Sequence, residues 1–208
     1  MIRSIAPVPD GSLAYGVNPM KKPLLVFEDI QSTPRRRIVT LLGTEILTTP
    51  WGWLSIPAFF LPGFGIGLIL RSGSFEAFSF VFAFASGFLL CLTNPIHSLG
   101  HILAGRMVRA PLYALLITAT RYVNIHKTDQ FLFSRFQRIA RAAGGPALNI
   151  AVGVIAFLLS EWLDSKLVFL AGYFNVAVGL WLLSPIPSLD GWVVWGELFG
   201  FRKRLGDT

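Results

Sequence analysis

The chain has 208 residues, of which 53% are hydrophobic and only 14% are charged. Charged residues make up roughly a quarter of ordinary soluble domains, so this composition excludes a soluble globular domain. The high apolar content also excludes a disordered chain, and the single cysteine, Cys91, excludes a disulfide scaffold. The composition therefore predicts an integral membrane protein.

The first 45 residues are polar and contain five prolines, which predicts a loosely ordered segment. They lack the layout of a secretory signal peptide, because the first long apolar run lies too far from the start and no small-residue cleavage pattern accompanies it. We expect residues 1–45 to form a cytoplasmic segment and residues 46–200 to form the membrane domain. Residues 201–208 are expected to form a basic tail.

Four runs without charged residues are long enough to cross a bilayer as helices, which takes about 20 mostly apolar residues each. These runs cover residues 46–70, 77–105, 142–160 and 167–189. We therefore predict an all-α polytopic membrane protein with about four transmembrane helices. Prolines and glycines in the first run predict a kinked or broken helix there, because neighbouring groups must satisfy the freed backbone. Asn94 and Pro95 are expected to interrupt the second run.

The lysines and arginines are distributed unevenly among the five segments that flank the four runs. From the N-terminus to the C-terminus these segments hold 6, 1, 7, 1 and 3 of them. Because cytoplasmic loops carry the excess of these residues, the counts place both termini and the long middle loop in the cytoplasm. The net charge of +7 is not gathered in one basic cluster, so we expect no nucleic-acid partner.

The middle loop contains two short patterns. Residues 112–120 are rich in β-branched side chains, which predicts a short strand or hairpin at the membrane surface. Residues 131–141 place arginines at three-residue spacing between aromatic residues, which is typical of an amphipathic helix on anionic lipid headgroups. A plain loop helix without lipid contact explains the second pattern equally well.

Two histidines, His97 and His101, are four residues apart near the cytoplasmic end of the second run. On a helix this spacing places both imidazoles on one face, where they can bind one metal ion. Asp190 follows the fourth run, and the predicted topology puts it at a similar depth. Two histidines and one carboxylate with an open fourth position are typical of a catalytic zinc site. The alternatives are histidines that only pack and hydrogen-bond, and an aspartate that forms a turn or helix cap before Gly191.

Three motifs resemble those of the site-2 proteases, the intramembrane zinc metalloproteases of peptidase family M50. Residues 97–101 (His-Ser-Leu-Gly-His) resemble the family's His-Glu-x-x-His. Residues 145–149 (Gly-Pro-Ala-Leu-Asn) resemble its Gly-Pro-x-x-Asn, and residues 185–191 resemble the stretch that ends in Asp-Gly. The resemblance covers residues 77 to about 200. It implies that His97, His101 and Asp190 bind zinc, and that Asn149 lies near a substrate, which would be a transmembrane protein or peptide.

The chain departs from this family at the general base. Ser98 stands where the family has the glutamate that takes a proton from the attacking water and passes it to the leaving amine. A serine hydroxyl is too weak a base for this task, so the expected loss in rate is roughly 10² to 10⁴. We do not expect zinc binding to suffer, because position 98 is not a ligand in the family. Glu197, seven residues beyond Asp190, is a weak candidate for a substitute base.

These observations leave three functions open. The favoured one is a zinc-binding pseudoprotease that holds a transmembrane client while its peptide hydrolysis is lost or weak. The second is an active intramembrane protease that uses another base, and the third is a structural membrane protein without a metal. A haem-binding electron carrier is disfavoured, because His97 and His101 share one helix face whereas axial ligands approach a haem from opposite sides.

Overall fold

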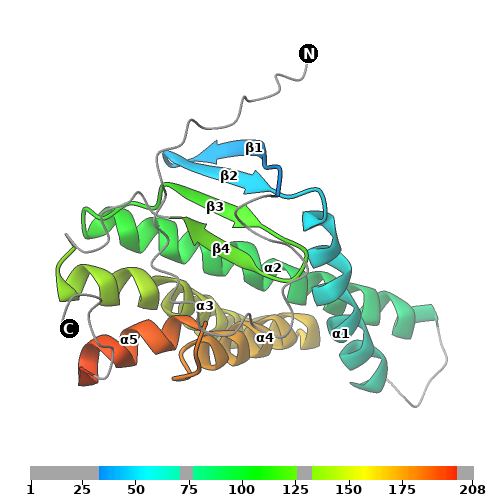
Figure 1. Ribbon diagram of the computed structural model, residues 1–208. Coiled ribbons are helices and arrows are strands. Elements are labelled where there is room, and N and C mark those ends of the chain that lie inside the picture. The colour runs from blue at the N-terminus through cyan, green and yellow to red at the C-terminus, as the bar shows by residue number, and fades with distance from the viewer. Residues whose placement is uncertain (1–32, 71–76, 126–132, 201–208) are drawn as a thin grey trace.

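The computed structural model describes residues 33–70, 77–125 and 133–200. The helices of these residues are α1 (Ser55–Leu70), α2 (Ala77–Met107), α3 (Arg135–Leu163), α4 (Lys166–Leu182) and α5 (Asp190–Phe199). The strands are β1 (Arg36–Leu41), β2 (Thr44–Thr48), β3 (Ala114–Ile117) and β4 (Tyr122–Ile125), and one turn of 3₁₀ helix, η1 (Gly52–Leu54), precedes α1. Figure 1 shows the strands as a layer on one side of the helices.

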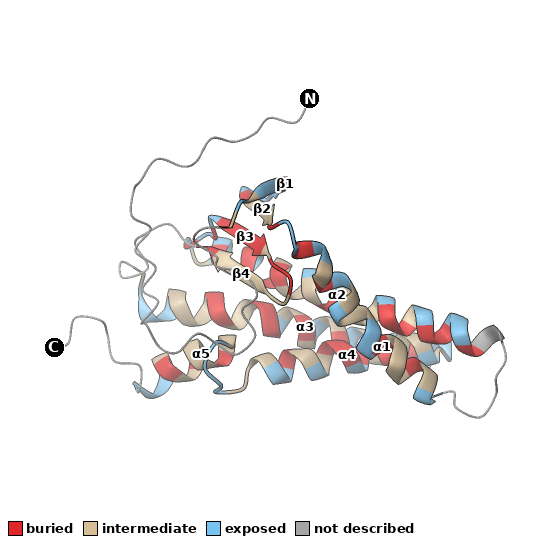
Figure 2. Ribbon diagram, turned by 45° about the vertical axis from the view of Figure 1, so that its right-hand side comes forward, coloured by how far each residue is buried: buried red, intermediate tan, exposed pale blue. Residues whose placement is uncertain are grey.

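Three helical segments among the described residues are long and apolar enough to cross a membrane. They are Gly52–Leu70, Ser79–Met107 and Arg135–Leu163, and α4 is a shorter apolar helix of 17 residues. Large apolar side chains such as Leu61, Phe84 and Leu158 are exposed on these segments, as expected for surfaces that face lipid. Figure 2 shows buried residues where the helices meet and exposed residues on their outer faces. The fourth predicted span stays a prediction.

The four strands form one sheet in the order β1-β2-β3-β4. Strands β1 and β2 form one antiparallel hairpin, and β3 and β4 form another. The hairpins are joined by parallel pairing of β2 with β3, with Glu45 opposite Ala114. Parallel neighbours need a crossover connection, which α1 and α2 provide here. The sheet therefore fixes the start of α1 to the segment that follows α2.

The structure differs from the sequence prediction before α1. Residues 36–41 and 44–48 form β1 and β2, where the sequence predicts loose order and then the start of a span. A count of charge-free residues does not distinguish a strand from a helix, and the first helix begins only at Ser55. The fold is therefore mostly helical with a small sheet, and the expected hairpin in the middle loop is half of that sheet. Residues 1–32 and 201–208 lie outside the described residues.

Two helices are longer and less interrupted than the sequence predicts. Helix α2 continues through Pro95. Helix α3 begins with a capping box, in which the Ser134 hydroxyl accepts from the Gln137 N–H and the Gln137 side chain accepts from the Ser134 N–H. It then continues without a break to Leu163, so most of the predicted amphipathic segment and the third predicted span form one helix. Contact of its arginines with lipid headgroups stays a prediction.

Candidate metal site

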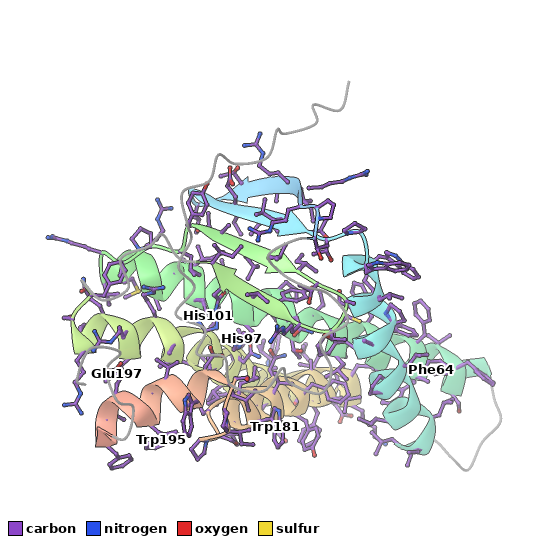
Figure 3. The ribbon with its side chains drawn as sticks, viewed as in Figure 1. Phe64, His97, His101, Trp181, Trp195 and Glu197 are labelled. Carbon is purple, nitrogen blue, oxygen red and sulfur yellow. The ribbon has the colours of Figure 1, made fainter. Side chains whose placement is uncertain are left out.

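Helix α2 carries His97 and His101 on one face, one turn apart. Their Nε2 atoms are 2.9 Å apart and their ring centroids are 4.5 Å apart. The side chain of His101 is almost fully buried, and that of His97 is 13% exposed. Figure 3 shows the two histidines side by side in the middle of the molecule. The spacing in the sequence therefore becomes a pair of converging imidazoles in the interior.

A close contact between α2 and α3 encloses these rings. A Cβ atom on Gly100 would collide with the carbonyl oxygen of Gly144. A Cβ atom on Gly145 would lie 2.5 Å from Cε1 of His97 and 2.6 Å from Nε2 of His101. Small residues let the backbones of membrane helices approach closely. Here they allow the α3 backbone to lie directly against the imidazoles.

Asp190, the first residue of α5, completes the group. Its Oδ2 lies 3.0 Å from Nε2 of His97 and 3.3 Å from Nε2 of His101. Burial raises the pKa of the Asp190 carboxyl, but hydrogen bonding to the imidazoles lowers it by more, so the net pKa lies below its usual range. The carboxylate is therefore the stable form at neutral pH, as a metal ligand requires.

The tautomer of His101 is set by the backbone of α3. Its Nδ1 lies 2.7 Å from the carbonyl oxygen of Arg141, which can only accept a hydrogen bond. Nδ1 therefore carries a proton, and in the neutral imidazole Nε2 presents a lone pair toward His97 and Asp190. This arrangement is typical of histidines that bind metal ions, whose second nitrogen is held by a carbonyl or carboxylate group.

The three converging atoms fit a metal ion better than they fit hydrogen bonding alone. If one of the two Nε2 atoms carries a proton, that N–H can donate to the other Nε2 and to the Asp190 carboxylate. The other Nε2 then points its lone pair at the same carboxylate, which is repulsive. A second proton would place two N–H groups head to head over 2.9 Å. A cation between the atoms satisfies all three contacts at once. Zinc ligands about 2.0 to 2.1 Å from a tetrahedral ion are roughly 3.3 Å apart, close to the observed 2.9, 3.0 and 3.3 Å.

Among the described residues, His97, His101 and Asp190 form the group of histidine, cysteine and acidic side chains that could hold a metal ion. Their donor atoms all lie within 4.8 Å of one another. The structure thus brings together the three residues that the sequence predicts as ligands, although Asp190 follows His101 by 89 positions in the chain.

Two further predicted residues are buried on the same pair of helices. Ser98 lies on α2 and is 4% exposed, and Asn149 lies on α3, one turn beyond Gly145, and is completely buried. Within the described part of the chain, neither the Ser98 hydroxyl nor either amide atom of Asn149 has a hydrogen-bond partner. Such orphaned polar atoms in an interior are costly unless another group satisfies them. They are therefore candidates for contact with water or a bound chain.

Glu197 is not brought to the histidines. Its two carboxylate oxygens accept from Nε and Nη2 of Arg138, each over 2.8 Å. Figure 3 shows Glu197 well separated from His97 and His101. The sequence prediction of a substitute base therefore has no support from this geometry.

The sequence did not predict the parts played by Arg141 and Gly145. Arg141 contributes a backbone carbonyl, for which no side-chain pattern exists. Gly145 matters because it has no side chain, which leaves room for the two imidazoles. This can be recognised only once the helix that faces Gly145 is known. The Gly-Pro-x-x-Asn resemblance contains Gly145, and it was the available signal that this part of α3 lies close to the two histidines.

Comparison with known proteins gives one type of match. No family model matches the chain, and no curated protein matches it by sequence. A solved structure, the site-2 protease from Methanocaldococcus jannaschii, matches it with a TM-score of 0.56 at 15% sequence identity. The match covers 83% of this chain and 74% of that one. The chain has the site-2 protease fold.

The site-2 protease fold agrees with the three motifs that carry the resemblance in the sequence. The match extends over most of the chain, so it includes more than the motif-bearing helices. At 15% identity the likeness is one of fold. What the site of this chain binds and does follows from its own residues.

Proposed function

We propose that this chain is a membrane metalloprotein with the site-2 protease fold, in which His97, His101 and Asp190 bind zinc. The observation that carries the proposal is the convergence of two imidazole nitrogens and one carboxylate oxygen within 2.9 to 3.3 Å. The Arg141 carbonyl supports it, because it holds His101 in the tautomer that a metal ligand needs. The second part of the proposal is that peptide hydrolysis is lost or weak.

Zinc in such a site supplies a Lewis acid that polarises a carbonyl oxygen and makes water more acidic. Hydrolysis also needs a side chain that accepts a proton from water and returns it to the leaving amine. The family uses a glutamate at position 98 for this step. Ser98 offers a neutral hydroxyl there, and it is buried away from bulk solvent. The residues of this chain thus supply binding and orientation without the proton transfer.

No other carboxylate takes over this task among the described residues of the site. Asp190 is used as a ligand, and both oxygens of Glu197 are engaged by Arg138. Neither of these two acids therefore supports an active protease that uses another base. This favours a pseudoprotease that binds a transmembrane client without cutting it. The orphaned amide of Asn149 and hydroxyl of Ser98 support this reading, because the backbone of a bound chain could satisfy both.

Zinc analysis of the purified protein tests the metal site. We expect close to one zinc per chain in the native protein and almost none after Asp190→Ala. Glu161→Ala is the matched control, because Glu161 is an exposed acid at the far end of α3 and should leave zinc content unchanged. A native protein without zinc, or an Asp190→Ala variant that retains it fully, would overturn the proposal.

A further inference from the structure

We propose that the ion pair between Arg138 and Glu197 is a positioning device for the metal site. It holds α5 in the rotation that directs Asp190 toward the two histidines. This inference rests on the proposed zinc site, and it assigns a purpose to two charged residues that do not themselves touch the ligands.

The pair has the geometry of a rigid clamp. Nε and Nη2 of Arg138 each donate to a different oxygen of Glu197 over 2.8 Å. Both side chains are largely covered, with 21% and 14% of their surface exposed. The remaining Nη1 donates to the carbonyl oxygen of Phe133. A two-pronged arginine contact fixes direction as well as distance, which a single charge contact does not.

Helix α5 needs such a clamp to hold a ligand in place. It has ten residues, and a helix this short is marginal without tertiary contacts. In its middle, the Trp195 indole N–H donates to the carbonyl oxygen of Leu183 over 2.7 Å. At its end, Arg135 donates to the carbonyl oxygen of Leu198 over 2.7 Å. The Arg138 pair adds a second contact between α5 and the first turns of α3, and this one joins two side chains.

The spacing of the two acids links the clamp to the metal site. Asp190 and Glu197 are seven residues apart, which is about two turns, so both carboxylates project from one face of α5. Fixing Glu197 against α3 therefore fixes the rotation that directs Asp190. A rotation of α5 by about 20° would move an atom about 6 Å from the helix axis by roughly 2 Å. Such a movement would take the Asp190 oxygen out of its contacts of 3.0 and 3.3 Å.

The same turns of α3 hold a second ligand. Arg141 follows Arg138 by one turn, and its carbonyl oxygen accepts from Nδ1 of His101. The start of α3 thus fixes His101 through its backbone and Asp190 through α5. The first turns of α3 therefore hold two ligands that come from different helices, His101 from α2 and Asp190 from α5. This keeps the distance between the two ligands constant.

Zinc affinity, measured by competition with a chelator on the full-length protein, tests this role. We expect Glu197→Gln and Arg138→Gln each to weaken zinc binding about tenfold, the lower end of the effect of removing groups that support metal ligands. Combining Glu197→Gln with Arg138→Gln should lower the zinc affinity no further than the more damaging of the two single substitutions, because the two residues act as a unit. The visible absorption of bound Co²⁺ should change in the same variants, since it reports the geometry of the ligands.

Two further variants separate positioning from general stability. Arg138→Lys keeps the positive charge but loses the two parallel hydrogen bonds to Glu197. This variant should therefore fold like the native protein and still bind zinc more weakly. The double variant Arg37→Gln with Glu45→Gln breaks an ion pair between β1 and β2 and should leave zinc affinity unchanged. Native protein that binds zinc together with unchanged affinity and Co²⁺ absorption in Glu197→Gln would overturn this inference alone. Native protein that binds no zinc would overturn the proposed function as well.

Discussion

In the proposed function, Ser98 separates metal binding from hydrolysis at the scale of one residue. It lies on α2 directly after His97, and its hydroxyl has no hydrogen-bond partner among the described residues. Zinc in proteins is ordinarily bound by cysteine, histidine and carboxylate side chains, so the Ser98 hydroxyl is not an expected ligand. Under the proposal, a serine at this position leaves the three ligands in place but supplies no proton acceptor. Zinc binding and peptide cleavage should therefore respond differently to substitution.

Restoring the acid at this position should restore hydrolysis. We expect Ser98→Glu to cleave a transmembrane peptide roughly 10² to 10⁴ times faster than the native protein, the usual contribution of a positioned general base. Cleavage is measured with zinc-loaded protein, and zinc content shows that the larger side chain has not disturbed the ligands. Ser98→Gln has a similar size without a base and should stay at the native rate. Native protein that already cleaves as fast as Ser98→Glu would contradict the loss of hydrolysis.

At the scale of elements, the site depends on how closely α3 approaches α2. A methyl group at Gly145 would meet both imidazoles at 2.5 and 2.6 Å. Gly145→Ala should therefore weaken zinc binding at least tenfold and destabilise the protein by about 1 to 3 kcal/mol, the usual cost of overpacking. Zinc competition and thermal unfolding measure the two effects. Gly65→Ala on α1 is the control, because a Cβ atom there has nothing within 4 Å. Unchanged zinc affinity in Gly145→Ala would mean that the close helix contact is unimportant.

The sequence predicts which segments form helices better than it predicts the residues at which those helices begin and end. Residues 77–105 anticipate α2 (Ala77–Met107) almost completely, because both its ends lie beside charged residues. Helix α3 starts at Arg135, seven residues before the third predicted span, because its start is set by the Ser134 capping box and not by the last charge. The hairpin of β1 and β2 was not predicted, since its parallel pairing with β3 joins residues about 70 positions apart.

At the scale of the whole molecule, the sequence predicts the three proposed ligands but not the groups around them. His97 and His101 follow from helix spacing, and Asp190 was predicted at a similar depth from the alternating loop charges; the structure brings the three side chains together. The Arg141 carbonyl, the clamp between Arg138 and Glu197 and the close contact at Gly145 could not, because each depends on how helices pack. Among the described residues, three helical segments are long and apolar enough to span a membrane, and the cytoplasmic position of both termini stays a prediction.

The X-ray absorption spectrum of zinc in the purified native protein tests the central claim most directly, because it reports which atoms surround the ion. The account predicts nitrogen and oxygen neighbours at about 2.0 to 2.1 Å, with the outer scattering pattern of two imidazoles. A sulfur neighbour at about 2.3 Å, or a shell of oxygen atoms without imidazole scattering, would contradict binding by His97, His101 and Asp190.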